Sequence, residues 1–271
     1  LTDHANRVTS ISFDADGRTF ASGSYDNSII VWDVETQTAL EKFQSGHTGP
    51  VMSVALSPDG KSLLSAGADS NLIVWDLAGR QSITSIVRPQ SSRINSVAFN
   101  PGGNILAAGT FNNSVILWDA DTLERLGPPL SRQSGSINSV AFSPDGVLLA
   151  SASADTSIVL WNVETLQPAG PPLTGHSSPI NSVVFSPDGK TLASASTDST
   201  IILWNTDTFQ PAGPPLAGHT SPVNSVSFHP NGNLLAAGHA DGSILLWDLT
   251  SRPPTSQVLT RRADSVSSLA F

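Results

Sequence analysis

The stretch that decides the fold is Gly175–Asn205, which reads GHSSPINSVVFSPDGKTLASASTDSTIILWN. Apolar residues flank the polar pair Asn181-Ser182 over Ile180–Phe185, small residues predominate over Leu192–Ser196, and an apolar run ends at Trp204. Short runs of this kind, separated by turn residues, are typical of β-strands joined by hairpins. In the turn Ser186–Gly189, proline fixes φ near about −65° and the glycine accepts a positive φ at the exit. The stretch therefore predicts three consecutive antiparallel strands.

The same pattern occurs six times along the chain. The tryptophans are 43 residues apart, at Trp32, Trp75, Trp118, Trp161, Trp204 and Trp247. A constant period of this length is the signature of a repeat architecture. A fourth stretch in each repeat, such as Gly170–Leu173, carries prolines that cannot donate to a ladder and so belongs at a sheet edge. Each repeat is predicted to be a four-stranded antiparallel sheet.

Side-chain size indicates how the sheets are arranged. The second strand of each repeat is rich in Ala, Ser and Gly, whereas the third ends in Trp. Small residues suit the narrow end of a wedge, as expected if the sheets converge on an axis. An all-β propeller is such an arrangement and leaves only short, protected sheet edges.

Composition narrows the possible partners. The 271 residues carry a formal net charge of −9 and no cysteine, so a disulfide framework and a Cys-ligated zinc site are ruled out. The thinly spread basic residues argue against a general nucleic-acid surface. No apolar run reaches the roughly 18 residues of a membrane span. We expect neither nucleic acid nor membrane as a partner, and a cytoplasmic location.

Six tryptophans in register, four of them followed by Asp, make the chain resemble the WD-repeat family over essentially its whole length. Gly-His pairs stand upstream at Gly46-His47, Gly175-His176 and Gly218-His219. The resemblance implies a structural tetrad of His, Ser or Thr, Asp and Trp in each blade. Three tetrads are complete: His4, Ser22, Asp26 and Trp32; His47, Ser65, Asp69 and Trp75; and His176, Ser194, Asp198 and Trp204. The fourth repeat has Gln133 for His, the sixth has Ala237 for Ser, and the third has Gln90, Ala108 and Asn112.

A His, a Ser and an Asp together also suggest a catalytic triad. The set recurs at the repeat period with a Trp attached, whereas a nucleophilic site is normally single, so the structural interpretation is favoured. No phosphate-binding glycine loop, nucleophile elbow or metal-ligand spacing is present. We predict a non-enzymatic chain with no catalytic residue, no cofactor and no metal.

Residues that break the repeat pattern mark a candidate protein-binding face. In the family, the narrow face binds partners through the residue before the turn Asp and the first positions of the inner strand. These positions hold Tyr25, the only tyrosine, Phe111 and Met52, the only methionine, and Arg7 and Arg93 stand two positions before the inner-strand position; all five lie in repeats one to three. Aromatics, Met and Arg are enriched in interface cores. Isolated exposed apolar residues are also common, so these five are a hypothesis.

Phe271 is in register with the first strand of a seventh repeat. We therefore expect one propeller domain over residues 1–271, a fragment of a longer chain, favouring a seven-bladed ring with an incomplete last blade. A six-bladed ring or a larger tandem is the alternative. Gly-Pro-Pro-Leu segments before the Gly-His pairs resemble the propellers of large bacterial multidomain signalling and defence proteins, which implies a sensor or scaffold beside an effector domain. A purely architectural or oligomerisation ring and a channel-site enzyme are the other functional possibilities.

Overall fold

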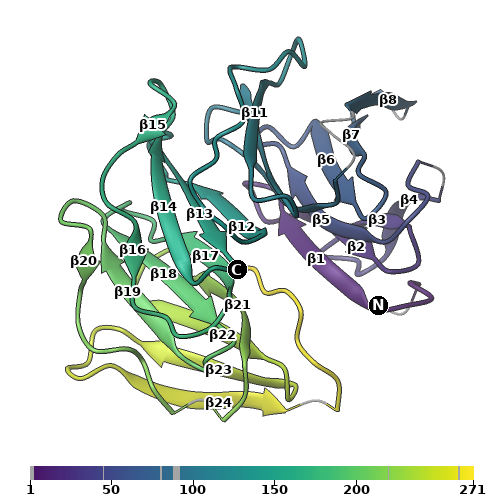
Figure 1. Ribbon diagram of the computed structural model, residues 1–271. Helices are drawn as coiled ribbons and strands as arrows, with labels where there is room; N and C mark the ends of the chain where they lie inside the picture. The colour runs from purple at the N-terminus through teal and green to yellow at the C-terminus, as the bar shows by residue number, and fades with distance from the viewer. Residues whose placement is uncertain (1–2, 45, 80, 88–91, 219, 262) are drawn as a thin grey trace. The chain divides into compact units, whose positions relative to one another are not determined.

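The computed structural model describes residues 3–44, 46–79, 81–87, 92–218, 220–261 and 263–271, and every regular element there is a β-strand (Figure 1). The chain divides into two compact units, Leu1–Pro129 and Leu130–Phe271. Each unit contains three antiparallel sheets, one from each 43-residue repeat. We refer to these sheets as blades one to six. The assignment of residues 1–271 to a single domain stays a prediction.

Blades one to three form the first unit. Blade one has β1 (Val8–Phe13), β2 (Thr19–Ser24), β3 (Ile29–Asp33) and β4 (Ala39–Phe43); blade two has β5 (Val51–Leu56), β6 (Ser62–Gly67), β7 (Leu72–Asp76) and β8 (Gln81–Val87); blade three has β9 (Ile94–Phe99), β10 (Ile105–Thr110) and β11 (Val115–Asp119). The outer strand of blade three is reduced to a bridge between Trp118 and Arg125. Two prolines, Pro128 and Pro129, follow that bridge and cannot donate to a ladder.

Blades four to six form the second unit. Blade four has β12 (Ile137–Phe142), β13 (Leu148–Ser153), β14 (Ser157–Asn162), β15 (Gln167–Pro168) and β16 (Leu173–Thr174); blade five has β17 (Ile180–Phe185), β18 (Thr191–Ser196), β19 (Ile201–Asn205) and β20 (Gln210–Pro211); blade six has β21 (Val223–Phe228), β22 (Leu234–His239), β23 (Ser243–Asp248) and β24 (Thr255–Arg261). The fourth, outermost position is the variable one. It is two short pieces in blade four, two residues in blade five and seven residues in blade six.

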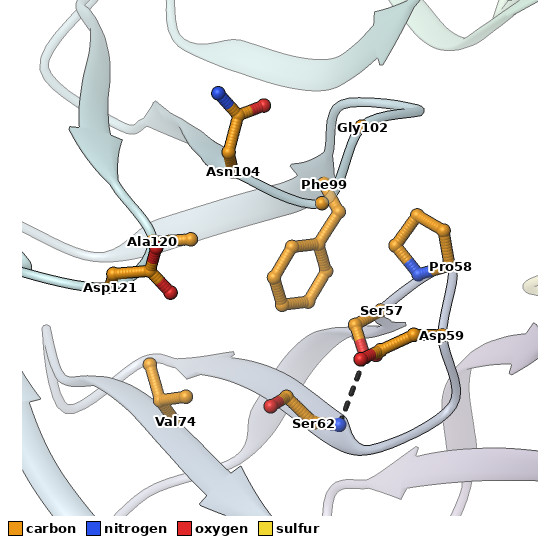
Figure 2. Close-up of a pocket in the computed structure, with 11 residues that line it drawn as sticks. Ser57, Pro58, Asp59, Ser62, Val74, Phe99, Gly102, Asn104, Ala120 and Asp121 are labelled. Carbon is orange, nitrogen blue, oxygen red and sulfur yellow. Dashed lines mark hydrogen bonds between the residues drawn. The ribbon is translucent and has the colours of Figure 1, made fainter.

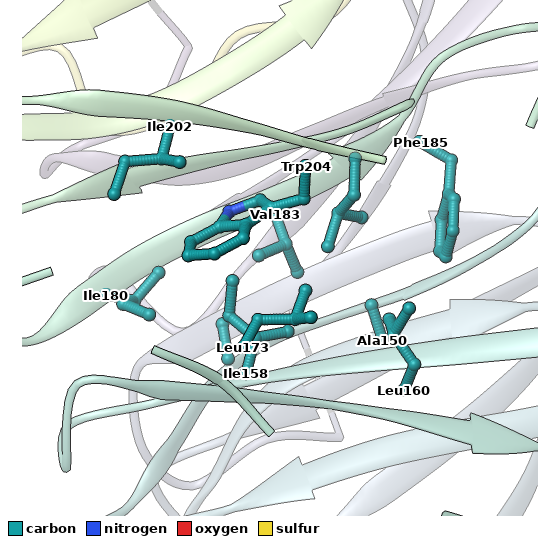
Figure 3. Packing of buried hydrophobic residues seen from close by; sticks show 11 residues of the cluster. Ala150, Ile158, Leu160, Leu173, Ile180, Val183, Phe185, Ile202 and Trp204 are labelled. Carbon is teal, nitrogen blue, oxygen red and sulfur yellow. The ribbon is translucent and has the colours of Figure 1, made fainter. Parts of the chain in front are cut away.

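Neighbouring blades within a unit share an apolar core. In Figure 3, Ile158 and Leu160 of blade four meet Ile180, Val183 and Trp204 of blade five, and all five side chains are buried. Burying a large apolar side chain contributes about 1.5–3 kcal/mol. The second strand is small because the next blade packs directly on it. A Cβ on Gly23 would lie only 2.7 Å from Val51 Cγ1.

Side chains of one inner strand also bond the backbone of the next blade. Ser139 Oγ accepts from the Val183 amide at 3.2 Å, and Asn181 Nδ2 donates to the Val223 carbonyl at 2.9 Å. Equivalent serine bonds join Ser10 to Val54, Ser53 to Val97, Ser182 to Val226 and Ser225 to Leu269. We call these bonds inter-blade stitches. Their donors and acceptors lie 42 or 44 residues apart, so the repeat period itself sets them.

The described residues form six blades, not the seven that we expected. Residues 263–271 lie against blade six through inter-blade stitches: Asn224 Nδ2 donates to the Val266 carbonyl at 2.9 Å, and Ser225 Oγ accepts from the Leu269 amide at 2.9 Å. The segment is not a β-strand, because a strand needs a neighbouring strand with which its backbone forms a ladder. Among the described residues none forms such a ladder with it. The predicted first strand of a seventh blade thus packs against blade six without becoming part of a sheet.

Candidate protein-interaction surface

The tight turn between the second and third strands positions the Asp of each tetrad. Residues at the exit of this turn have positive φ, between 64° at Ser70 and 81° at Gly242. This conformation directs the Asp carboxylate back toward the loop that enters the blade. In blade five, Asp198 accepts from the Ser177 amide at 2.9 Å and from the Thr200 hydroxyl at 2.6 Å. The Asp therefore fixes both the turn and the incoming loop.

The structure brings together the four side chains of each complete tetrad. In blade five, His176 Nδ1 lies 2.9 Å from Asp198 Oδ2, His176 Nε2 lies 2.8 Å from Ser194 Oγ, and Trp204 Nε1 donates to Ser194 Oγ at 2.8 Å. Blade two repeats this with His47, Asp69, Ser65 and Trp75, and blade one with His4, Asp26, Ser22 and Trp32. The serine, and not the histidine, accepts the hydrogen bond of the indole N–H. The serine hydroxyl thus links the imidazole to the indole.

The protonation of the blade-five tetrad follows from burial. Burial lowers the pKa of His176 below its ordinary 6.5, although Asp198 acts in the opposite direction. For Asp198, burial would raise the pKa, but hydrogen bonds from Thr200, the Ser177 amide and His176 outweigh it and leave the pKa lowered. At neutral pH the histidine is uncharged and the aspartate ionised. The imidazole proton then lies on Nδ1 toward Asp198, and Ser194 donates to Nε2 while accepting from Trp204.

This Asp–His–Ser order is that of a catalytic triad, yet the hydroxyl cannot act as a nucleophile. Ser65 and Ser194 are completely buried, and the indole N–H occupies a lone pair of each oxygen. A substrate carbonyl has no path to either hydroxyl. The tetrads of blades two and five therefore stabilise their blades and supply no acyl-transfer chemistry.

Blade four replaces the histidine by Gln133 and keeps the bonds to the serine and the tryptophan, whereas Asp155 is bonded by Ser134 and Ser157 instead. The Gln133 carbonyl oxygen accepts from Ser151 at 2.6 Å, and its amide nitrogen donates to the Ser151 and Ser157 carbonyls at 3.1 and 2.9 Å. Trp161 still donates to Ser151. In the other incomplete tetrads, Gln90 and His219 lie outside the described residues.

The predicted binding residues lie together on the first unit. The Tyr25 amide donates to the Arg7 carbonyl at 2.9 Å, and the Phe111 amide donates to the Arg93 carbonyl at 2.9 Å. Each aromatic residue is thereby fixed beside an arginine. Tyr25 is 40% and Phe111 is 61% exposed, and both arginines are exposed. We call Arg7, Tyr25, Met52, Arg93 and Phe111 the Arg–aromatic rim.

Blade two supplies the middle of the rim with smaller groups. The Ala68 amide donates to the Pro50 carbonyl at 2.9 Å, which is the same contact that pairs Arg and aromatic residue in blades one and three. Met52, two residues along β5, is half-buried. We call each pair, Arg7 with Tyr25 and Arg93 with Phe111, an Arg–aromatic corner. The two corners flank an apolar segment of smaller side chains, Pro50, Met52 and Ala68.

Met52 also replaces a stitch donor. At this position Thr9 donates to the Val51 carbonyl at 2.6 Å, and Asn138, Asn181 and Asn224 donate to the carbonyls of Ile180, Val223 and Val266 at 2.9 Å. A methionine thioether has no hydrogen to donate. The contact between blades two and three gives up this bond at the centre of the rim.

A pocket that was not predicted from the sequence lies between blades two and three, at the ends of their inner strands opposite the rim. Figure 2 shows this pocket of about 300 Å³, with Val74, Phe99 and Ala120 as its apolar wall and Asp59, Asn104 and Asp121 among its polar residues. The signal was in the repeat pattern. Ala120 stands where Val34, Leu77, Val163 and Leu249 occur in other repeats, and Gly102 stands where Asp59 and Asp188 occur.

Among the described residues, no three His, Asp or Glu side chains come together as metal ligands would. No helix that could span a bilayer is found in that part of the chain.

Comparison with known families assigns the fold. A family model described as the Echinoderm microtubule-associated protein second beta-propeller matches residues 51–215, and one described as the WD domain, G-beta repeat, matches residues 1–33 and 214–248. No curated protein sequence matches the chain. Since the first model spans more than half of the residues and the second lies on both sides of it, the chain belongs to the WD-repeat β-propeller family that these two models describe.

Proposed function

We propose that this chain is a non-catalytic protein-recognition module and that its partner docks on the Arg–aromatic rim. WD-repeat propellers generally mediate protein–protein interactions and are typically not enzymes. The rim has the residue types of an interface centre, in which a few aromatic and arginine side chains dominate the binding energy. Its five members lie in one unit of the chain.

The observation that carries the proposal is that Met52 and Phe111 depart from the repeat pattern in ways that do not serve the fold. Met52 gives up a hydrogen bond that contributes about 1 kcal/mol at the equivalent position of other blades. Phe111 leaves 61% of its surface in water, where the equivalent residues of blades two, four and six are alanines. Residues that break a repeat rule without a gain for the fold are expected where function selects them.

In a longer polypeptide we propose that the module holds or releases an attached effector domain, as a cytoplasmic sensor or scaffold. The support is the resemblance of the Gly-Pro-Pro-Leu segments at 127–130, 170–173 and 213–216 to those of bacterial multidomain proteins. An architectural ring is the competing function. It needs no pattern-breaking rim, so the rim substitutions separate the two.

The test is affinity capture from a lysate of the source organism with the wild-type chain and with the triple variant Tyr25→Ala, Met52→Ala and Phe111→Ala. The matched control removes exposed apolar side chains elsewhere: Leu40→Ala, Val258→Ala and Leu259→Ala. A partner retained by the control and lost by the triple variant supports recognition through the rim. A partner retained by all three proteins moves the site elsewhere, and capture of no partner favours the architectural function.

A further inference from the structure

We propose that the Arg–aromatic rim selects an acidic partner: an extended segment that carries an Asp or Glu beside an apolar residue, with the carboxylate on Arg93. This inference rests on the proposed function and adds the chemistry of the ligand.

The blade-three corner presents an available cation. Arg93 is exposed, and among the described residues its guanidinium has no hydrogen-bond or ion-pair partner. Its planar fork can hold a carboxylate through two parallel N–H bonds, which are among the stronger hydrogen bonds in proteins. The Phe111 amide donates to the Arg93 carbonyl, so the two residues are neighbours across this bond. One ligand can therefore place a carboxylate on the Arg93 guanidinium and its next side chain on the Phe111 ring.

Blade three also lacks the negative charge that accompanies this rim position elsewhere. The turn residue after the rim aromatic or its equivalent is Asp26, Asp69, Asp155, Asp198 or Asp241 in the other five blades, and the pKa of each is lowered, so each is ionised at neutral pH. In blade three this residue is Asn112, immediately after Phe111. The neutral amide of Asn112 accepts from the Thr110 hydroxyl and adds no negative charge that would repel an acidic ligand at this end of the rim.

The rim continues with the same chemistry at its other end. Arg7 and Tyr25 repeat the corner two blades away, and Pro50, Met52 and Ala68 supply apolar groups between the corners. The Asp26 and Asp69 carboxylates nearby are occupied by His4 and the Ala5 amide and by His47 and the Thr48 amide. A ligand with an apolar centre followed by a carboxylate at the blade-three end therefore matches the rim in charge and in order.

The chain's formal charge of −9 does not prevent this selection. At physiological ionic strength, charges more than about 8 Å apart in water are largely screened. The groups at the corner, and not the distant acids, then decide which peptide binds.

The experiment is selection of a displayed library of random dodecapeptides on the wild-type chain, followed by affinity measurement for an enriched peptide. We expect enriched sequences to place Asp or Glu next to a large apolar residue. Arg93→Ala should weaken the enriched peptide by at least about tenfold, and Asn112→Asp should weaken it by about three- to tenfold, because the added negative charge repels an acidic ligand. Arg18→Ala, which removes an exposed arginine paired with Asp16, is the matched control and should leave the affinity unchanged. Arg93→Glu should reverse the selection toward Lys and Arg.

The outcomes separate the two proposals. If the enriched peptides lack acidic residues, or bind Arg93→Ala as tightly as wild type while Phe111→Ala abolishes binding, the rim binds partners but the acidic preference is wrong. If neither Arg93→Ala nor the triple variant Tyr25→Ala, Met52→Ala and Phe111→Ala affects binding, both the acidic preference and the rim itself are wrong. An unchanged unfolding midpoint of Arg93→Ala shows that any loss is local.

Discussion

Replacing Ser194 by Ala removes the hydroxyl that links His176 to Trp204 in the blade-five tetrad and should destabilise the protein by about 2–4 kcal/mol. The serine hydroxyl bonds two buried groups, Trp204 Nε1 at 2.8 Å and His176 Nε2 at 2.8 Å. The alanine methyl can bond neither. Each buried polar group left without a partner costs about 1–3 kcal/mol, and Ser194 is completely buried, so water cannot replace the hydroxyl without rearrangement.

The assay is urea-induced unfolding followed by tryptophan fluorescence, with the free energy of unfolding obtained from the midpoint and slope. The matched control is Ser182→Ala, one strand away. The Ser182 hydroxyl accepts a single, long bond of 3.4 Å from the Val226 amide and is half-buried. This control should cost less than about 1 kcal/mol, since one weak bond is lost.

A loss at Ser194 no larger than that of the control would refute the reasoning, because it would mean that the indole and imidazole find other partners at no cost. A large loss with an unchanged slope supports it. A changed slope would instead report loss of cooperativity along the repeat array.

Three further predictions concern single substitutions. His176→Gln, which copies Gln133 of blade four, should reduce the loss of stability on acidification. Burial holds the pKa of His176 in the folded state below 6.5, so the wild type loses stability as the pH falls below 6.5. Urea midpoints at pH 7.5 and 5.5 measure the difference between the two proteins. Thr156→Gly should stabilise the protein by about 1 kcal/mol, because a β-branched residue at a φ of 75° is strained where blade six has Gly242; a lower melting temperature of the variant would contradict this. Met52→Asn should restore the missing stitch and add about 1 kcal/mol in urea unfolding while weakening capture of the rim's partner, and a variant that gains stability with undiminished capture would remove Met52 from the site.

Much of the fold could be predicted from the sequence because the period repeats the same local rules six times. The turn glycine at Gly189 has a φ of 72°, and its amide donates to the Ser186 carbonyl at 2.9 Å, as the Pro-Asp-Gly pattern indicates. The small second strand is explained by the approach of the next blade, as at Gly23 and Val51. These features depend on neighbours in sequence or on a neighbour one period away.

The sequence was a weaker guide where a feature depends on a specific partner. The seven-bladed prediction was wrong for the described residues because a correct register at Phe271 does not provide a second strand. The outermost strands vary from a bridge at Trp118 to seven residues in β24, since nothing packs them in a common way. The rim residues stand out as breaks in the pattern, but their pairing through backbone bonds, such as Phe111 with Arg93, joins residues distant in sequence that no local rule relates.

The inter-blade stitches have a consequence for how such a chain can change. Each joins a Ser, Thr or Asn side chain to a backbone amide or carbonyl of the next repeat, as in Ser139 to Val183 and Asn181 to Val223. A backbone group is present whatever the side chain there, so no complementary pair has to be kept in the receiving repeat. A copied or exchanged 43-residue segment would thus meet its new neighbours ready to bond. Evolution by blade duplication and shuffling requires only that the donor positions survive, and where one is lost, as at Met52, the cost is confined to a single joint.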